Sequence, residues 1–337
     1  MNDEPRTPRP PIWVGVVLTI VSVGALVWLI SRDTESLAPF GEVAATEVIA
    51  IFALQLAYLV VESYRMQIVI EASSGVSLEP VAWFRIFVTG RLLNMIVPQS
   101  GNVYRAVRLK RDHRVPYISF GGALGAFLWL SVTLNLVVAS ILIALNSPEL
   151  DAGPVPGWVA LLAAALAAAI GPLAVWFLVR DRGGSGRLGF VVTTLAAVLD
   201  ASVAAVRDGA LLVKFALVWL VTIIVVVFLY GTVLSVVGAD LGAGELIALY
   251  ALVQVTSFVV ITPGNLGIQE VGFAALATLL GATAAQGAAA AAIIRITGTI
   301  ALAVPAVLTG LGDLRSALRG RDPDQDPSDG ATDAEAS

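Results

Sequence analysis

Long apolar stretches separated by short polar segments run through the chain from residue 12 to about residue 311. Most of them reach the roughly 20 residues that a helix needs to cross a bilayer. We therefore expect an all-α fold, a polytopic bundle of membrane helices. The pattern predicts six full crossings, at residues 12–31, 44–64, 116–146, 157–179, 212–238 and 289–311.

Composition supports a membrane protein, because 58% of the residues are hydrophobic and 13% are charged, far from the balance of soluble domains. The apolar run that follows Arg6 and Arg9 is too long for a signal peptide and lacks a convincing cleavage site, so we expect a retained first helix. The aspartate-rich end of the chain predicts a disordered acidic tail. The expected organisation is a cytoplasmic N-terminus, a flippase-like transmembrane domain and a cytoplasmic tail, at residues 1–11, 12–315 and 316–337.

Basic residues collect in one set of loops, which the positive-inside rule places in the cytoplasm. The opposite loops carry acids such as Glu149 and Asp151 with no base beside them. Both termini are then expected on the cytoplasmic side of the cytoplasmic membrane. The basic loops hold Arg6 and Arg9; Arg105, Arg108, Lys110, Arg111 and Arg114; Arg180, Arg182 and Arg187; and Arg315, Arg319 and Arg321.

Two termini on one side require an even number of crossings, and two further apolar segments are then expected to be re-entrant. Residues 81–97 lie between cytoplasmic loops and should enter and return. Residues 246–281 should enter from the opposite face and turn at TPGNLGIQE, giving about eight membrane helices and an inverted repeat of the kind found in secondary transporters. We expect residues 188–206 to lie in the interface as an amphipathic helix, the alternative being a further crossing.

The first broken segment contains the sequence NMIVPQSGNVYR, which begins at Asn94. Pro98 ends the apolar run and Gly101 permits a tight turn. Ser100 or Asn102 is expected to cap the helix that restarts after the turn.

The restarting helix carries Arg105 and Arg108, whose spacing of three places both on one helix face. Guanidinium groups beside free backbone amides can bind phosphate. The alternative is that the two arginines only enforce the positive-inside topology.

The second broken segment has a similar order of residues. Pro263 ends a helix, Gly264 and Gly267 permit turns, and Asn265 is expected to cap the helix that restarts before Glu270. An exposed helix N-terminus favours anions. The alternative is a kinked helix packed by small residues.

Glu270 and Arg295 are the only charged residues between positions 246 and 312. A lone charge at bilayer depth costs at least roughly 2.5 to 3.5 kcal/mol, so we expect the two to pair. The pair either fixes the fold permanently or opens when an anionic headgroup binds the arginine. The predicted substrate-binding residues are Asn94, Pro98, Ser100, Gly101, Asn102, Arg105, Arg108, Pro263, Gly264, Asn265, Gly267, Glu270 and Arg295.

The motifs LNMIVPQSGNVYRA and TPGNLGIQEVG, together with Arg295 in the last apolar segment, resemble those of the lysylphosphatidylglycerol synthase transmembrane region family, the flippase-like integral membrane proteins. The resemblance extends over most of residues 10–315. In the first motif the family usually has an acid directly after the glycine, where this chain has Asn102. No counterpart of the family's soluble aminoacyl-transfer domain is found in the sequence. The resemblance implies translocation of a lipid or lipid-linked headgroup across the cytoplasmic membrane rather than its synthesis.

The leading functional expectation is a non-enzymatic transporter of a phospholipid or lipid-linked phosphate headgroup. A membrane-embedded transferase that uses a polyprenyl-phosphate sugar, and a non-catalytic scaffold, are the alternatives. With no cysteine and a single histidine, we expect no metal and no cofactor. The expected partners are an anionic phospholipid or polyprenyl-linked lipid and no nucleic acid; a homo-oligomer and a separate lipid-modifying enzyme stay open.

Overall fold

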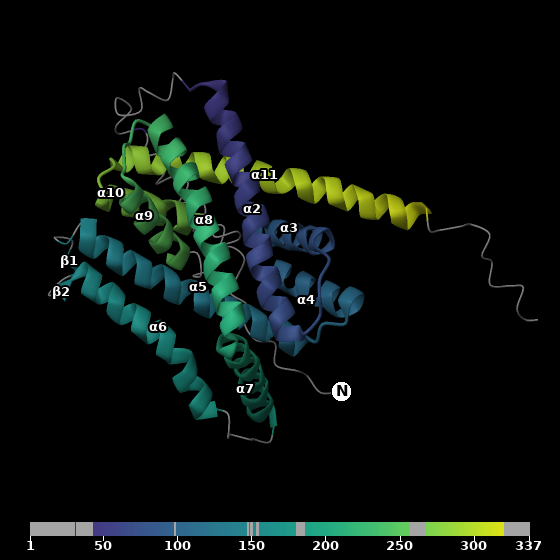
Figure 1. Cartoon of the computed structure of the whole chain (residues 1–337). Helices are drawn as coiled ribbons and strands as arrows, with labels where there is room; N and C mark the ends of the chain where they lie inside the picture. Colours follow the sequence, from purple (N-terminus) through teal and green to yellow (C-terminus); the bar gives the residue numbers. More distant parts are fainter. Residues whose placement is uncertain are drawn as a thin grey trace, which may run out of the picture.

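The computed structural model describes residues 31, 43–97, 99–146, 148, 151–152, 155–179, 186–256 and 267–319. This part of the chain is almost entirely helical (Figure 1). Its helices are α2 (Ala45–Ser74), α3 (Pro80–Ile96), α4 (Ser100–His113), α5 (Tyr117–Asn146), α6 (Gly157–Val179), α7 (Gly186–Arg207), α8 (Gly209–Val236), α9 (Ala243–Thr256), α10 (Ile268–Leu279) and α11 (Ala284–Arg319). The strands β1 (Asp151–Ala152) and β2 (Val155–Pro156) form one antiparallel pair between α5 and α6.

Local sequence signals account for several helix ends. The Glu79 carboxylate accepts hydrogen bonds from the backbone amides of Val81 and Ala82, and Pro80 occupies the first turn of α3, where its missing N–H has no intrahelical partner to lose. Helix α2 ends at Gly75, which adopts a left-handed conformation with φ 67°, as glycine does at helix C-termini.

Five helices in the described part are long and apolar enough to cross a membrane: α2, α5, α6, α8 and the segment Ala284–Leu308 of α11. They coincide with five of the six predicted crossings, whereas the crossing predicted at 12–31 lies outside the described residues. The all-α, multi-pass membrane fold is confirmed. The number of crossings and the side on which the termini lie stay predictions.

The second crossing was predicted too short. Helix α2 continues ten residues past the expected end at 64 and reaches Ser74. Glu62, near the end of the predicted crossing, and Arg65, just beyond it, lie inside the bundle with exposed fractions of 8% and 1%. They tolerate this position because the carboxylate and guanidinium are one helical turn apart and pair at 2.7 Å.

The prediction for the first re-entrant segment was also wrong. Residues 81–97 do not enter and return, because α3 is one uninterrupted helix, and the return is made by α4. The two helices pack against each other around a three-residue break in which Gln99 is left-handed, with φ 65°. A Cβ atom at Gly101 would lie 1.7 Å from the carbonyl oxygen of Gly90, so glycine at this position permits the close approach of α4 to α3.

A second pair of short helices, α9 and α10, also pack against each other. They flank residues 257–266, which lie outside the described part, so the predicted turn at Pro263, Gly264 and Asn265 is not described. Whether the two helix pairs enter the membrane from opposite faces stays a prediction.

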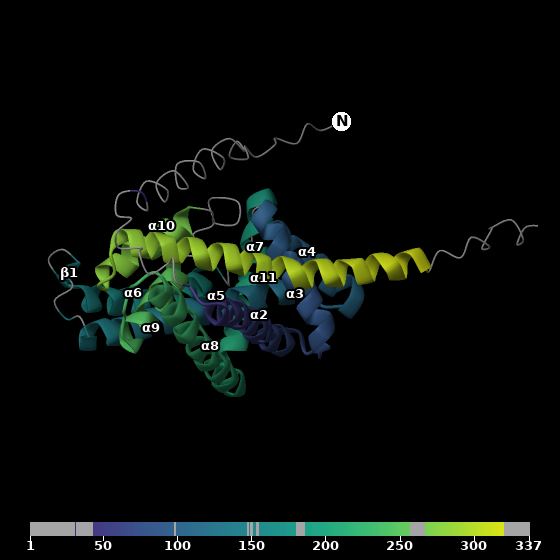
Figure 2. The same cartoon turned by 90° about the horizontal axis from the view of Figure 1, so that it is seen from above.

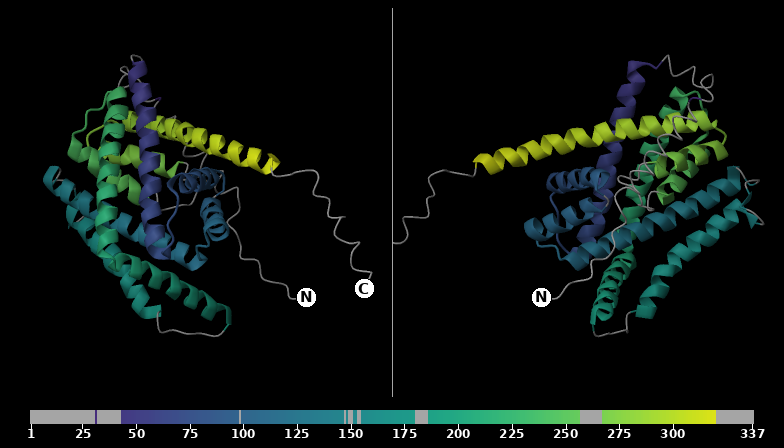
Figure 3. Two further views of the ribbon diagram at one scale, coloured as in Figure 1. Left: turned by 45° about the vertical axis from the view of Figure 1, so that its right-hand side comes forward. Right: turned by 180° about the vertical axis from the view of Figure 1, so that it is seen from behind.

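Helices α2 and α8 run side by side, α5 lies against α6, α7 and α9, and α11 passes α10, α2 and α3 (Figures 1 and 3). Seen from above, the C-terminal part of α11 projects beyond the other helices (Figure 2). The buried apolar side chains form two clusters, one centred on α2, α3 and α5 and the other on α8, α9, α10 and α11. The helices that meet between these clusters enclose the candidate site.

Helix α7, expected at residues 188–206 in the interface, packs against α5. Ser202 Oγ donates a hydrogen bond of 2.9 Å to the carbonyl oxygen of Gly122. A Cβ atom at Gly122 would lie 2.3 Å from that of Ala201, so the two helices approach closely through small residues. The depth of α7 in the membrane stays a prediction.

Candidate functional site

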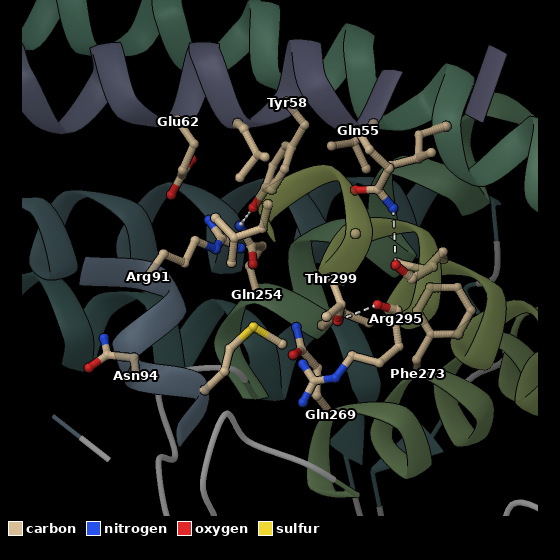
Figure 4. Close-up of a pocket in the computed structure, with 18 of the residues that line it drawn as sticks. Gln55, Tyr58, Glu62, Arg91, Asn94, Gln254, Gln269, Phe273, Arg295 and Thr299 are labelled. Atoms are coloured by element: carbon tan, nitrogen blue, oxygen red, sulfur yellow. Dashed lines mark hydrogen bonds between the residues drawn. The ribbon is translucent and has the colours of Figure 1, made fainter. Parts of the chain in front are cut away.

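A cavity of about 370 Å³ with many polar lining residues lies inside the bundle, where α2, α3, α4, α5, α8, α9, α10 and α11 converge (Figure 4). Its volume is at the lower end of the range of roughly 300 to 1,000 Å³ for small-molecule sites. Besides apolar residues, the wall carries amides, hydroxyls and charges. These polar lining residues are Gln55, Tyr58, Glu62, Arg65, Arg91, Asn94, Gln99, Asn102, Tyr230, Gln254, Gln269, Glu270, Arg295 and Thr299.

The broken ends of both short-helix pairs reach this cavity. Gln99 and Asn102, at the start of α4, line one part of the wall, and Gln269 and Glu270, at the start of α10, line another. The first-turn amides of a helix lack intrahelical acceptors and carry partial positive charge. Two segments far apart in sequence therefore begin helices beside one cavity, as discontinuous helices do in transporters. At α4 the first-turn amides already donate to Val97 O, Asn94 Oδ1 and Gln99 O.

Glu270 and Arg295 form the expected ion pair, which is thereby confirmed. Glu270 Oε1 lies 3.0 Å from Arg295 Nε, while Glu270 Oε2 accepts a hydrogen bond of 2.6 Å from the backbone amide of Gly267. The carboxylate is buried, with 6% of its side chain exposed, whereas 21% of the Arg295 side chain is exposed. One residue thus pairs α10 with α11 and caps the N-terminus of α10.

A second buried ion pair, absent from the sequence prediction, lies on the α2 side. Arg65 donates to Glu62 through Nη2, and its guanidinium carbon lies 5.0 Å from the centre of the Phe127 ring and 5.5 Å from that of Phe215. The signal that could have found it is a glutamate and an arginine three apart in a long helix, once α2 is continued past residue 64.

Arg91 enters the cavity from α3 (Figure 4). Its guanidinium carbon lies 5.6 Å from the centre of the Tyr58 ring, a cation–π distance. Among the described residues, no carboxylate lies within 4.0 Å of its nitrogens. Arg91 is not among the predicted site residues. The signal that could have found it is an arginine inside the apolar segment 81–97.

Neutral groups complete the wall. Gln254 Nε2 donates to the hydroxyls of Tyr250 at 3.1 Å and Tyr58 at 3.4 Å. Gln55 Nε2 donates to the carbonyl oxygen of Ile294 at 3.1 Å, which connects α2 to α11. These side chains come from helices whose apolar patterns differ little from those of the other spans, so only the packing identifies them.

The structure brings four of the predicted site residues to the cavity: Asn94, Asn102, Glu270 and Arg295. Gly267 adjoins them through its hydrogen bond to Glu270. The positions of Pro98, Pro263, Gly264 and Asn265 lie outside the described residues. Ser100, Gly101, Arg105 and Arg108 do not line the cavity.

The expected caps of α4 are wrong. Ser100 Oγ donates backwards to the carbonyl oxygens of Leu93 and Val97, and Asn102 Nδ2 donates to Gln99 Oε1. The N-cap residue is Gln99, whose side chain makes no capping hydrogen bond. The backbone at Gln99 is left-handed, and the side chain that caps the first turn comes from α3, since Asn94 Oδ1 accepts from the Gly101 amide at 2.7 Å.

Arg105 and Arg108 do not form the joint phosphate site expected from their spacing. Arg105 is buried and donates to the carbonyl oxygen of Phe87 at 3.1 Å and to Asn102 Oδ1 at 3.3 Å, so it connects α4 to α3. Arg108 pairs with Asp112 at 3.0 Å. A hydrogen bond from Arg111, helped by the charge of Arg108, lowers the pKa of Asp112 at this end of α4.

Within the described residues, no group of three or more His, Cys, Asp or Glu side chains could hold a metal ion. The chemical resources of the cavity are therefore hydrogen-bond donors, hydroxyls and two ion pairs. Such groups can bind and orient a polar group, and guanidinium groups suit an oxyanion.

A bundle of apolar helices that buries charged side chains around a polar cavity defines an integral, multi-pass membrane protein with an internal polar site. Residues 12–306 match the family described as the lysylphosphatidylglycerol synthase TM region, and the chain belongs to this family. The resemblance found in the two motifs is thus confirmed. No curated protein matches the chain, and no solved structure matches it.

Proposed function

We propose that the protein translocates the phosphate-bearing headgroup of a membrane lipid across the cytoplasmic membrane. The observation that carries the proposal is the polar cavity between the broken ends of two helix pairs. A lipid tail can stay in the hydrocarbon during such a movement, and only the headgroup needs a polar path. Membership of a family named for a lipid synthase's membrane region supports a lipid as the transported molecule.

The cavity, rather than the Arg105 and Arg108 face, is the headgroup site in this proposal. Arg91 and Arg295 provide guanidinium groups to it from α3 and α11, and the first turn of α10 adjoins it through Gln269 and Glu270. Guanidinium groups and helix N-termini both bind phosphate oxygens. Arg105 has a supporting role, because its guanidinium is engaged with α3 and Asn102.

The test is a flipping assay with the purified full-length chain in liposomes. Fluorescent phosphatidylglycerol is placed in both leaflets, and an impermeant reductant reports how much of it reaches the outer leaflet. We expect protein-containing vesicles to lose fluorescence beyond the outer-leaflet half. Gly298→Leu should reduce the rate to that of empty vesicles, because Gly298 lines the cavity and a Cβ there would lie 3.3 Å from Gln55 Oε1.

Gly171→Leu is the matched control, since a Cβ at Gly171 meets no atom within 4 Å and the residue lies on α6 away from the cavity. A Gly298→Leu protein that elutes like the unmodified chain and flips at the full rate would show that the cavity is not the path. Flipping no faster than in empty vesicles by the unmodified protein, for every phosphate lipid tried, would refute translocation and favour a scaffold.

The proposed orientation, with both termini in the cytoplasm, has a separate test. The chain contains no cysteine, so a single cysteine at Asn102 and another at Asn265 can be labelled from each side with an impermeant thiol reagent. The inverted-pair arrangement predicts labelling of the two positions from opposite faces. Labelling of both from one face only would contradict it.

A further inference from the structure

We propose that the cavity selects a phosphodiester headgroup that has one negative charge, a neutral hydroxyl-bearing alcohol and no ammonium group. This inference rests on the proposed function, because it treats the cavity as the site that the headgroup occupies. It adds the class of headgroup and the residues that set the selection. Glycerol and inositol phosphodiesters belong to this class, whereas ethanolamine and aminoacylated headgroups do not.

The charges in the wall leave one cation for the ligand. Arg65 is paired with Glu62, and Arg295 is paired with Glu270. Arg91 lines the same cavity, and none of the described carboxylates pairs with it. A charge on a membrane helix requires a partner or a polar surround, so a single phosphodiester anion complements the wall.

Hydrogen bonds orient two side-chain amides so that they offer donors. Arginine has donors only, so Arg105 Nη1 fixes Asn102 Oδ1 as the acceptor, at 3.3 Å. The Asn102 amide group must then point its Nδ2 to Gln99 Oε1, at 2.7 Å. With its oxygen turned to Asn102, Gln99 has both hydrogens of Nε2 to offer as donors.

Asn94 is oriented by the same logic. Its Oδ1 accepts a hydrogen bond of 2.7 Å from the backbone amide of Gly101, so its Nδ2 is the group that remains. Gln269 lies on the other helix pair, in α10. Its side-chain amide makes no hydrogen bond to the described residues, so it can offer both a donor and an acceptor to the cavity. Donors on Arg91, Asn94 and Gln99 suit phosphate oxygens, and the amide of Gln269 suits a hydroxyl.

Each carboxylate in the described part of the wall already has an arginine partner, so an ammonium group finds no unpaired carboxylate there. Both oxygens of Glu270 are engaged, by Arg295 and by the Gly267 amide, and Glu62 is engaged by Arg65. A cation in the cavity would therefore face Arg91 without a compensating carboxylate, which is unfavourable at low dielectric. Asn102 and Arg105 act as positioning residues, since they orient Gln99 and do not supply the charge themselves.

The experiment is native mass spectrometry of the purified full-length chain in neutral detergent with an equimolar lipid mixture. The mixture contains phosphatidylglycerol, phosphatidylinositol, phosphatidylethanolamine and lysylphosphatidylglycerol with matched acyl chains. We expect the first two to be retained in preference to the others. Arg91→Gln should weaken their retention roughly 10- to 100-fold, the effect of one charge-assisted hydrogen bond. Arg85→Gln, on an exposed position of α3, should leave it unchanged.

Asn102→Asp tests the orienting chain. A carboxylate cannot donate to Gln99, so Gln99 would turn its oxygen to the cavity, and a negative charge would stand beside Arg105. We expect the preference for glycerol and inositol lipids over ammonium-bearing lipids to fall at least roughly tenfold. An unchanged preference would overturn the role of Asn102.

The outcomes separate this inference from the proposed function. Equal or stronger retention and flipping of lysylphosphatidylglycerol by the unmodified chain would overturn the charge selection and leave translocation intact. Loss of flipping for all four lipids, with none retained, would remove both. Retention of deacylated glycerophosphoglycerol that depends on Arg91, without retention of the lipids, would support the charge selection and identify a soluble phosphodiester as its source.

Discussion

The geometry of the ion pair between Glu270 and Arg295 predicts how much stability the protein loses when the pair is broken. In Glu270→Gln, the remaining oxygen can still accept from the Gly267 amide, as Glu270 Oε2 does at 2.6 Å. The new amide nitrogen then faces Arg295 Nε, which now lies 3.0 Å from a carboxylate oxygen. Two donors would meet, and the positive charge of Arg295 would lose its partner.

Breaking a buried ion pair from one side costs roughly 3 to 5 kcal/mol. Because 21% of the Arg295 side chain is exposed, solvent relieves part of this loss and we expect about 3 kcal/mol. At roughly 2 to 4 °C for each kcal/mol, the melting temperature should fall by about 6 to 12 °C. The double variant Glu270→Gln with Arg295→Gln should lose less than the sum of the single variants, by roughly 0.5 to 3 kcal/mol.

The assay is thermal unfolding of the full-length chain in detergent, followed by the fluorescence of its seven tryptophans. One heating rate is kept for all variants, because membrane proteins often unfold irreversibly. Asp240→Asn is the control, since Asp240 is exposed and its loss should change stability by less than about 0.5 kcal/mol. An unchanged melting temperature for Glu270→Gln, or strict additivity in the double variant, would refute the reasoning.

The double variant also separates a structural pair from a mechanistic one. A double variant that folds and flips lipid would show that the pair only holds α10 against α11. A folded but inactive one would give the charges a direct role. Exchanging the two residues is a poorer test, because an arginine at position 270 cannot accept the hydrogen bond from Gly267.

Two further predictions concern packing. Gly101→Ala should destabilise the chain by at least roughly 1 to 3 kcal/mol through overpacking, because its Cβ would lie 1.7 Å from the carbonyl oxygen of Gly90. The control Gly171→Ala, whose Cβ meets no atom within 4 Å, should be neutral or slightly stabilising. Equal melting temperatures for the two variants would contradict this prediction. Asn135→Leu should lower the free energy of unfolding by roughly 0.6 to 3 kcal/mol, because it removes the acceptor 3.2 Å from Trp219 Nε1 inside the bundle. Adding Trp219→Phe should recover part of this stability in the same melting assay, and no recovery would argue against the hydrogen bond.

Apolar patterning determined the class of the protein and most of its elements. Segments such as 157–179 were placed correctly because an apolar run of this length has few alternatives to a membrane helix. The pairing of Glu270 with Arg295 was predictable for a related reason: in an apolar region with two charges, each is the nearest available partner of the other.

The limits of α2 and the return limb of the first helix pair were not predictable in this way. Arg65 lies beyond the end of the crossing when only hydropathy is considered, since its pairing with Glu62 and its contacts with the rings of Phe127 and Phe215 appear only after folding. The caps of α4 were assigned to Ser100 and Asn102 by residue type, but the Ser100 hydroxyl is used by α3.

By itself, the sequence determined that this is an all-α membrane protein with one charge pair in its last apolar region, because burial in lipid admits few other solutions for such a chain. Only the tertiary structure decided which polar groups share a cavity. Arg91 and Gln269 lie on different helix pairs, and Arg105 lies outside the cavity and donates to Asn102. Which way a buried polar side chain points depends on donors and acceptors distant in sequence, and only packing brings these together.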